Sequence, residues 1–453
     1  MKKIIETIKN IWKIEDLRLR IITTLGLLLI YRLGSFIVLP GIDPEQLSAL
    51  KTQGGTGGLV DLLNMFSGGA FSNASIFALG IMPYISASIV IQLLSMAVPY
   101  FQKMQKEGES GRKKINQITR YLTVIITAAQ APAYLGNLRM QLRPEAFAPF
   151  DPAITSQPFI FWLTSILLLV TGTMFVMWIG ERITEKGIGN GISLIIMVGI
   201  IARLPHAFGY ELTDAFNKPE GRLVFFLVEM VLLVLVILLT ILLVQGTRRI
   251  PVQYAKRVYG NKQYGGVRQY IPLKVNAAGV MPIIFAQAIM FVPLTLAGFA
   301  SSENSSFLRT FSDPTSFWYN FTFFIMIILF TYFYTAITYN PIQMADEMKK
   351  NGGFIPGIKP GKKTAEYLDN IMSRITLPGS IFLGIVAILP AFAMIGGINT
   401  QFAYFYGGTS LLILVGVVLD TLQQIESHLL MRHYDGLMKT GKIKGRSSTG
   451  MGN

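Results

Sequence analysis

The sequence predicts an all-α protein that crosses a membrane many times. Of its 453 residues, 51% are hydrophobic and only 14% are charged, and the mean hydropathy is +0.49. Such a composition is typical of multi-spanning membrane proteins. The formal net charge of +15 is also unevenly distributed, because Lys and Arg gather in segments that separate the apolar runs. Apolar runs and clustered charges together define the class.

Ten apolar runs are predicted to form transmembrane helices. A helix needs about 20 residues to cross a hydrocarbon core of roughly 30 Å. The fifth run is short, and three glycines of the sequence GIGNG (residues 187–191) crowd its start. The predicted spans are approximately 21–39, 74–98, 118–138, 158–179, 190–205, 223–244, 275–298, 317–338, 376–395 and 408–426.

The distribution of basic residues predicts the orientation of these spans. Segments on one side of the membrane hold 32 of the 40 Lys and Arg residues, and the segments on the other side hold eight. Cytoplasmic loops carry such an excess, so both termini are expected in the cytoplasm. The predicted divisions are a basic N-terminal segment 1–20, an N-terminal half 21–205, an external hinge loop 206–222, a C-terminal half 223–426 with cytoplasmic loops 245–274 and 339–374, and a basic tail 427–453.

The segment around the second span is interrupted. A short apolar stretch, Leu62–Phe66, is too brief to cross a bilayer, and Gly68–Gly69 breaks it. Ser72–Asn73 offers N-cap side chains, and 25 uncharged residues follow in Ala74–Val98. Two structures fit this pattern. One is a re-entrant half-helix buried in protein before a full span, and the other is an external loop before an ordinary span.

Two cytoplasmic loops are longer than helix connections require. Loop 245–274 has seven basic residues, no acidic residue and four tyrosines, and a hairpin is expected to turn near Gly260–Asn261. Loop 339–374 is rich in Gly and Pro and should lead into a short helix from Thr364. The charges either only fix orientation or form a docking surface for RNA phosphate or an acidic protein face.

Several kinds of chemistry are excluded. With no cysteine and only three histidines, the chain lacks thiolate metal sites, iron–sulfur clusters and cysteine nucleophiles. It also lacks HExxH, GxSxG and GxxxxGK[ST] motifs. The glycine-rich GIGNG has no preceding strand and opens a membrane helix, which argues against nucleotide binding. No enzymatic activity, metal or cofactor is therefore expected.

The spans offer aliphatic faces in place of charge. Ionisable residues are rare there, the clearest being Arg32, Glu229 and Asp420. Ile81, Ile85 and Ile89 share one helical face, as do Ile192 and Ile196. Such isoleucines are either ordinary core or a hydrophobic constriction that excludes water and ions. Uncharged polar residues placed to hydrogen-bond between helices are Ser86, Gln92, Gln130 and Asn276.

Several motifs, in order along the whole chain, resemble the SecY family of protein-conducting channels. NMFSGGA followed by FALGIMPYISASIVIQLL (residues 64–70 and 77–94) resembles the family's plug and second pore helix. The other similar segments are LPGID (39–43), WIGERITEKGIGNGIS (178–193), RRIPVQYAKR (248–257), PLKVNAAGVMPIIFA (272–286), FIPGIKPGKKTAEYLD (354–369) and GGTSLLI (407–413).

The resemblance implies a fold and a set of functional residues. The fold is two inverted five-helix halves around a central hourglass pore, with a lateral gate through which transmembrane segments leave. The implied pore ring is Ile81, Ile85, Ile192, Ile196, Ile284 and Ile413. The implied plug is Asp61, Leu62, Leu63, Asn64, Met65, Phe66, Ser67, Gly68 and Gly69, within about 61–73. The implied lateral-gate cluster is Ser86, Gln130 and Asn276.

The resemblance also implies partners and a location. Secretory polypeptides, signal sequences and membrane lipid would be met in the bacterial cytoplasmic membrane, beside the small subunits SecE and SecG. Family members commonly have arginine where this chain has Lys359, and lysine keeps the charge but loses the bidentate fork. The residues implied to dock the SecA motor or the ribosome are Arg248, Arg249, Lys256, Arg257 and Lys359.

Two other functions fit parts of the sequence. A solute transporter would need buried charge or broken helices at its substrate site, and only the short, glycine-preceded fifth span suggests one. A membrane scaffold that tethers ribosomes would explain the basic loops. It would leave the interrupted segment at 61–73 and the uncharged span faces without a role.

Overall fold

The computed structural model is predominantly helical. It describes residues 12, 14–44, 47, 64–142, 158–217, 222–254, 257–259, 262–264, 268–276, 278–287, 289–290, 313 and 315–440. Six helices in this part of the chain are long and apolar enough to cross a membrane, and a bent pair would make seven. The six are residues 159–186, 191–217, 222–245, 317–350, 362–395 and 408–429.

By length and apolar composition, the described residues thus give fewer spans than the ten predicted. Helices α2 and α7 have spanning lengths of 20 and 33 residues, but they are more polar than the six. The bent pair joins residues 82–95 and 99–105 at 101°. The predicted seventh span, 275–298, lies partly outside the described residues.

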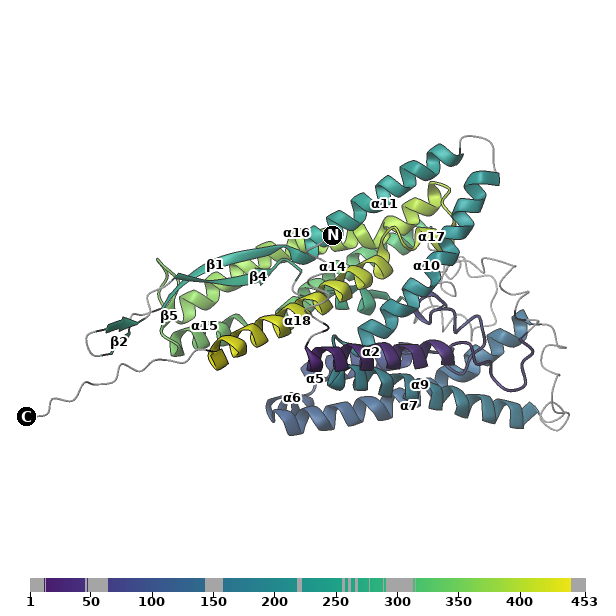
Figure 1. Ribbon diagram of the computed structural model, residues 1–453, viewed down its shortest axis with the longest axis horizontal. Coiled ribbons are helices and arrows are strands. Elements are labelled where there is room, and N and C mark those ends of the chain that lie inside the picture. Colours follow the sequence, from purple (N-terminus) through teal and green to yellow (C-terminus); the bar gives the residue numbers. More distant parts are fainter. Residues whose placement is uncertain are drawn as a thin grey trace, which may run out of the picture.

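One group of helices comes from the N-terminal part of the chain and lies together in Figure 1. In this group α5 packs on α7, α7 packs on α9, and α9 packs on α2 and α10. Its core is formed by buried residues such as Ala131, Leu135 and Leu169. The helices are α2 (Glu15–Gly34), α5 (Met82–Ala97), α6 (Pro99–Lys106), α7 (Glu109–Gln141), α9 (Pro158–Lys186) and α10 (Gly191–Asn217).

The second group comes from the C-terminal part, and α10 joins the two groups by packing on both α9 and α18 (Figure 1). Within this group α14 packs on α16, and α18 packs on α11 and α16. The helices are α11 (Arg222–Gln245), α14 (Phe317–Thr338), α15 (Pro341–Lys350), α16 (Lys362–Ile395), α17 (Thr400–Ala403) and α18 (Gly408–Thr440).

A small antiparallel sheet projects from one end of the second group (Figure 1). Its strand order is β4–β1–β5, with β1 (Thr247–Tyr254) between β4 (Arg268–Lys274) and β5 (Gly353–Phe354). Beyond it, β2 (Arg257–Tyr259) pairs with β3 (Lys262–Tyr264). Tyr259 pairs with Lys262 in this ladder, so β2 and β3 form the predicted hairpin, whose predicted turn residues Gly260–Asn261 lie outside the described residues.

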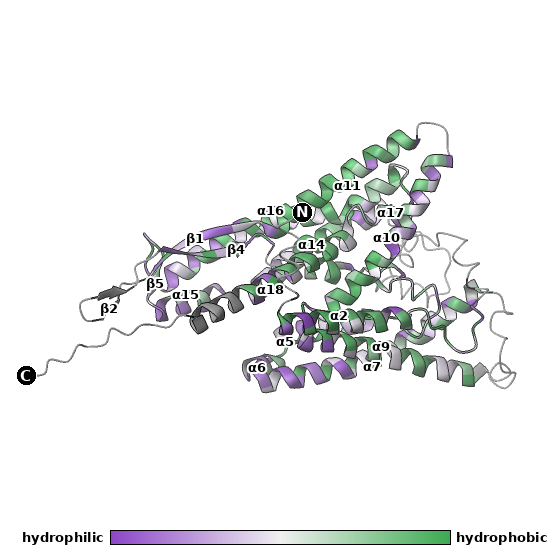
Figure 2. Ribbon diagram, in the orientation of Figure 1, coloured by the Kyte–Doolittle hydropathy of each residue, from purple (hydrophilic) through white to green (hydrophobic). Residues whose placement is uncertain are grey.

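The sheet and two helices share one hydrophobic core. Ile250, Val252 and Leu273 are almost fully buried against Met348 of α15 and Leu368 of α16. The alternation of buried and exposed residues along β1 accounts for this one-sided packing. Both predicted cytoplasmic loops therefore form one unit. Figure 2 shows hydrophilic residues at this end, over α15 and β1, and hydrophobic residues along α9, α11 and α14.

Three predicted element boundaries are wrong. The second span does not start at Ala74 with Ser72–Asn73 as N-cap, because turns continue to Ile81 and helix α5 starts at Met82. Residues 206–217 of the expected external loop belong to α10, which continues through Pro205 to Asn217. The expected short helix from Thr364 is the start of α16, which runs unbroken for 34 residues. In each case tertiary packing, which local sequence does not reveal, decides where the helix ends.

Candidate channel site

Six isoleucines from four helical segments converge in one hydrophobic cluster. Ile81, Ile196 and Ile413 are buried, and the other three are partly buried against the same cluster. They come from the start of α5, from α10, from the helical residues 281–287 and from α18. The six are Ile81, Ile85, Ile192, Ile196, Ile284 and Ile413. The structure therefore brings together all six residues that the resemblance assigned to a ring.

The interrupted segment enters this same cluster. Met65 and Phe66 are buried in it at 5% and 6% exposure. The described part is one helical turn, residues 64–66, followed by turns rather than a longer half-helix. Asp61, Leu62 and Leu63 of the predicted plug lie outside the described residues.

Local hydrogen bonds explain the fold of this segment. Asn64 closes the loop on itself, since its Oδ1 accepts from Ser72 N at 3.1 Å and its carbonyl accepts from Gly69 N at 2.8 Å. Gly68 and Gly69 have φ of +64° and +93°, where glycine is favoured. A Cβ on Gly68 would lie 2.8 Å from Gly199 Cα of α10. The segment therefore approaches α10 at a distance that only glycine permits.

Side chains from four helices hold the segment in place, among them Tyr134 of α7, whose hydroxyl donates to the carbonyl of Phe71 at 2.8 Å. Arg32 of α2 donates from Nη1 to Gly68 O at 2.6 Å, and Arg203 of α10 donates from Nη2 to Ser72 Oγ at 3.1 Å. From α18, the Ser410 hydroxyl contacts Met65 Sδ at 3.3 Å. Two arginines and Tyr134 of the N-terminal group thus bind the segment, with one weak contact from the C-terminal group.

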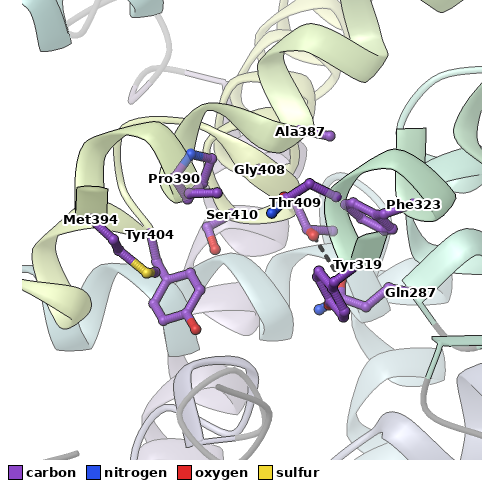
Figure 3. Close-up of a pocket in the computed structure, with 12 residues that line it drawn as sticks. Gln287, Tyr319, Phe323, Ala387, Pro390, Met394, Tyr404, Gly408, Thr409 and Ser410 are labelled. Atoms are coloured by element: carbon purple, nitrogen blue, oxygen red, sulfur yellow. Dashed lines mark hydrogen bonds between the residues drawn. The ribbon is translucent and has the colours of Figure 1, made fainter. Parts of the chain in front are cut away.

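A small hollow lies in the C-terminal group beside this contact (Figure 3). It is lined by residues of α14, α16, α18 and the helical stretch near Gln287. Thr409 Oγ1 donates to Gln287 Oε1 at 2.7 Å across its wall, as the dashed line in Figure 3 marks. Ser410 lines the hollow and also contacts Met65. The hollow therefore adjoins the interrupted segment.

The predicted lateral-gate residues are not joined by hydrogen bonds. Ser86 Oγ donates to the carbonyl of Met82 in its own helix at 3.2 Å. Asn276 is buried, and its Oδ1 has no hydrogen-bond partner. Gln130 is partly buried on α7. Within the described ranges, no hydrogen bond joins any two of these three side chains.

Three of the predicted docking residues lie where a large partner can reach them. Arg248 and Arg249 are exposed on β1, and Lys359 is exposed in the turn before α16. The turn is closed by Thr364 Oγ1, which donates to Lys359 O at 3.0 Å. Arg257 lies in β2, and Lys256 falls outside the described residues.

The GIGNG turn is occupied by the protein itself. Gly189 N donates to Gln424 Oε1 of α18 at 2.9 Å, and Ile188 N donates to Thr24 Oγ1 of α2 at 3.1 Å. Gly191 N donates to Thr184 Oγ1 at 2.9 Å. Phosphate-binding loops need such amides free, so this turn joins helices and does not offer a phosphate cradle. Over the described residues there is no group of three or more His, Cys, Asp or Glu side chains placed to hold a metal.

Solved structures with a similar fold define the class of protein. One, titled "The structure of a protein conducting channel", aligns with a TM-score of 0.63 over 94% of this chain and 95% of its own, at 17% identity. A canine Sec61 structure from a ribosome-channel complex aligns at 0.61 over 94% of this chain and 95% of its own, at 16% identity. The fold is that of a protein-conducting channel.

Sequence comparison then gives the family. The family model SecY matches residues 75–422. The protein translocase subunit SecY of Chlamydia trachomatis is 42% identical over 97% of this chain and 99% of its own length. That of Mycobacterium bovis is 44% identical over 94% of this chain and 97% of its own. The chain belongs to the SecY family, as the resemblance of its motifs predicted.

Proposed function

We propose that this chain is the channel through which unfolded secretory polypeptides cross the bacterial cytoplasmic membrane. The observation that carries the proposal is that six isoleucines from both helix groups share one hydrophobic cluster with Met65 and Phe66. Aliphatic side chains held by dispersion contacts exclude water at rest and separate without breaking hydrogen bonds. They form a constriction that widens around an extended chain and closes behind it.

In this proposal the interrupted segment, residues 61–73, is the plug of the resting channel. Its contacts with Arg32, Arg203 and Ser410 support this role, because separate side chains hold the segment without a covalent link and can release it. A signal sequence or nascent transmembrane helix opens the seam between α5 and α7 on one side and α14 with residues 281–290 on the other. Transmembrane segments leave through this seam into lipid.

We assign the energy for translocation to a partner, because the sequence has no GxxxxGK[ST] motif and its glycine-rich turn has three amides bound by the protein itself. Arg248, Arg249 and Lys359 lie exposed on one unit of β1, α15 and the start of α16, which suits contact with rRNA phosphate or with the SecA motor. Arg257 and Lys256 belong to the same proposed surface. Two structural neighbours were solved with a ribosome, Sec61 in the canine ribosome-channel complex and the yeast Ssh1 complex bound to the yeast 80S ribosome. We place this surface and both termini in the cytoplasm, with SecE and SecG as companion subunits.

Site-specific photo-cross-linking tests the polypeptide path. A probe at Ile85 in the assembled translocase is exposed to a stalled secretory chain, and a probe at Leu232, exposed on α11, serves as control. We expect an adduct at Ile85 that requires a functional signal sequence, and none at Leu232. The absence of an adduct at Ile85, in membranes where the complex still exports protein, would overturn the pore assignment.

A further inference from the structure

One side-chain hydrogen bond connects the two helix groups at the seam. The hydroxyl of Tyr334 on α14 donates to Gln92 Oε1 on α5 at 2.9 Å. Helix α5 packs mainly on α6 and α7, whereas α14 packs mainly on α16. Gln92 and Tyr334 are 242 positions apart in the sequence. The bond therefore connects parts of the chain that otherwise belong to different helix groups.

The same face of α5 carries apolar contacts with the C-terminal group. Ile89, three residues before Gln92, is buried in a cluster with Phe285, Ile327 and Phe330. The Tyr334 ring meets Phe285 edge-on, with centroids 5.5 Å apart. Since residues three and four apart share a helix face, Ile89 and Gln92 present one surface to α14. Apolar contacts bring the helices together, and the hydrogen bond fixes their register.

The orientation of the Gln92 side chain is itself set within α5. Its Nε2 donates to Ser88 Oγ at 3.3 Å, one turn earlier, so that Oε1 is directed towards Tyr334. Because the Ser88 bond already orders the Gln92 side chain, the bond to Tyr334 costs little further side-chain entropy. That bond is also directional. Gln92 Oε1 is therefore oriented in advance to accept a hydrogen bond from the Tyr334 hydroxyl.

We infer that Gln92 and Tyr334 form the polar latch of the lateral seam. They are a positioning pair that holds α5 against α14 in the closed channel. This inference rests on the proposed channel function and adds to it, because Ser86, Gln130 and Asn276 make no hydrogen bond to one another in this state. A single hydrogen bond between apolar helices is weak enough for an arriving signal sequence to break.

The test removes the hydroxyl oxygen of Tyr334. Tyr334→Phe keeps the ring contact with Phe285 and loses the donor. Tyr332→Phe on the same helix is the matched control, because the Tyr332 hydroxyl makes no hydrogen bond within the described residues. We expect Tyr334→Phe to raise export of a precursor with a defective signal sequence by about 3- to 20-fold in the assembled translocase. Export of the normal precursor should stay near the parental rate, and the control should match the parent.

A double-mutant comparison separates a latch from a general loosening. Gln92→Leu alone, and Gln92→Leu with Tyr334→Phe, should each give the same gain as Tyr334→Phe, since all three lack the bond between Tyr334 and Gln92. Additive gains, or a Tyr334→Phe variant that behaves like Tyr332→Phe, would overturn the latch and leave the channel function standing. If the parental complex itself exports no precursor, the proposed channel function is wrong. This outcome differs from those that overturn only the latch.

Discussion

Arg32 Nη1 donates to the backbone carbonyl of Gly68 at 2.6 Å, which ties the last turn of α2 to the turn of the interrupted segment. The guanidinium also lies 4.9 Å from the centre of the Phe36 ring. A charged donor makes a stronger hydrogen bond than a neutral one, about 1.5–3 kcal/mol. Because a backbone carbonyl accepts the bond, a substitution at Gly68 need not remove it, but a substitution at Arg32 does.

Replacing Arg32 with methionine should therefore loosen the plug. We expect the resting open fraction to rise by about 10- to 100-fold, the equivalent of losing one charge-assisted hydrogen bond. The measurement is ion conductance of the purified complex in a planar bilayer without substrate. Arg139→Met is the control, since Arg139 lies on α7 near Trp162. Equal conductance in the two variants would show that Arg32 does not hold the plug.

Gly68→Ala should displace the plug by a different route. A Cβ at this position would lie 2.8 Å from Gly199 Cα, and φ is +64°, which costs an L-residue about 1–2 kcal/mol. We expect a leaking channel with little change in the unfolding of the rest of the protein. Gly136→Ala, where a Cβ would meet nothing within 4 Å, is the comparison. A sealed Gly68→Ala channel would contradict the close approach to α10.

Serine in place of Ile85, Ile192 and Ile284 together should make the resting channel leak ions. These three are the partly buried members of the isoleucine set, so their replacement costs less folding energy than replacing the buried ones. Hydroxyl groups hydrate the constriction and remove the dewetted barrier. Bilayer conductance measures the leak, and Leu→Ser changes at lipid-facing positions of α11 serve as control. Unchanged conductance would count against the ring.

Arg222→Met should destabilise the junction between α10 and α11. Arg222 Nη2 donates to Glu211 Oε1 at 3.0 Å and to Gly397 O at 2.9 Å, and the Glu211 side chain is 1% exposed. Removing one partner of a buried ion pair costs about 3–5 kcal/mol, reduced here because Arg222 is partly solvated. Unfolding in detergent should show this loss, and Glu211→Gln with Arg222→Met should recover part of it. A double variant no more stable than Arg222→Met would argue against the pair.

Gln in place of Arg248, Arg249 and Lys359 should weaken partner binding and leave the seal intact. Each removed phosphate contact lowers the slope of log affinity against log salt by about one. Ribosome binding at several salt concentrations gives that slope. Lys113→Gln, on the exposed face of α7, is the control. If the slope stays at the parental value, these charges do not contact the ribosome and serve only to set the orientation in the membrane.

Much of the architecture could be predicted from local patterns. The helix at 317–338 was predicted at both ends, and the pairing of β2 with β3 confirms the predicted hairpin, because apolar length and strand pairing are local properties. The start of α5 was missed. Residues 74–81 are as uncharged as a helix requires, but Gly80 has φ +54° and Ala74 has φ +44°. Contacts such as Ser75–Val38 pairing hold that stretch in turns.

The sequence by itself determined the class, the family and the isoleucine set, because composition, charge asymmetry and ordered motifs are all written along the chain. Only the tertiary structure decided which side chains and backbone groups from distant parts of the chain meet. The bond of Arg32 to Gly68, the bond of Gln92 to Tyr334 and the pairing of Gly189 with Gln424 join residues distant in sequence. Hydrogen bonds are directional and short-ranged, so they exist only once packing has placed both partners.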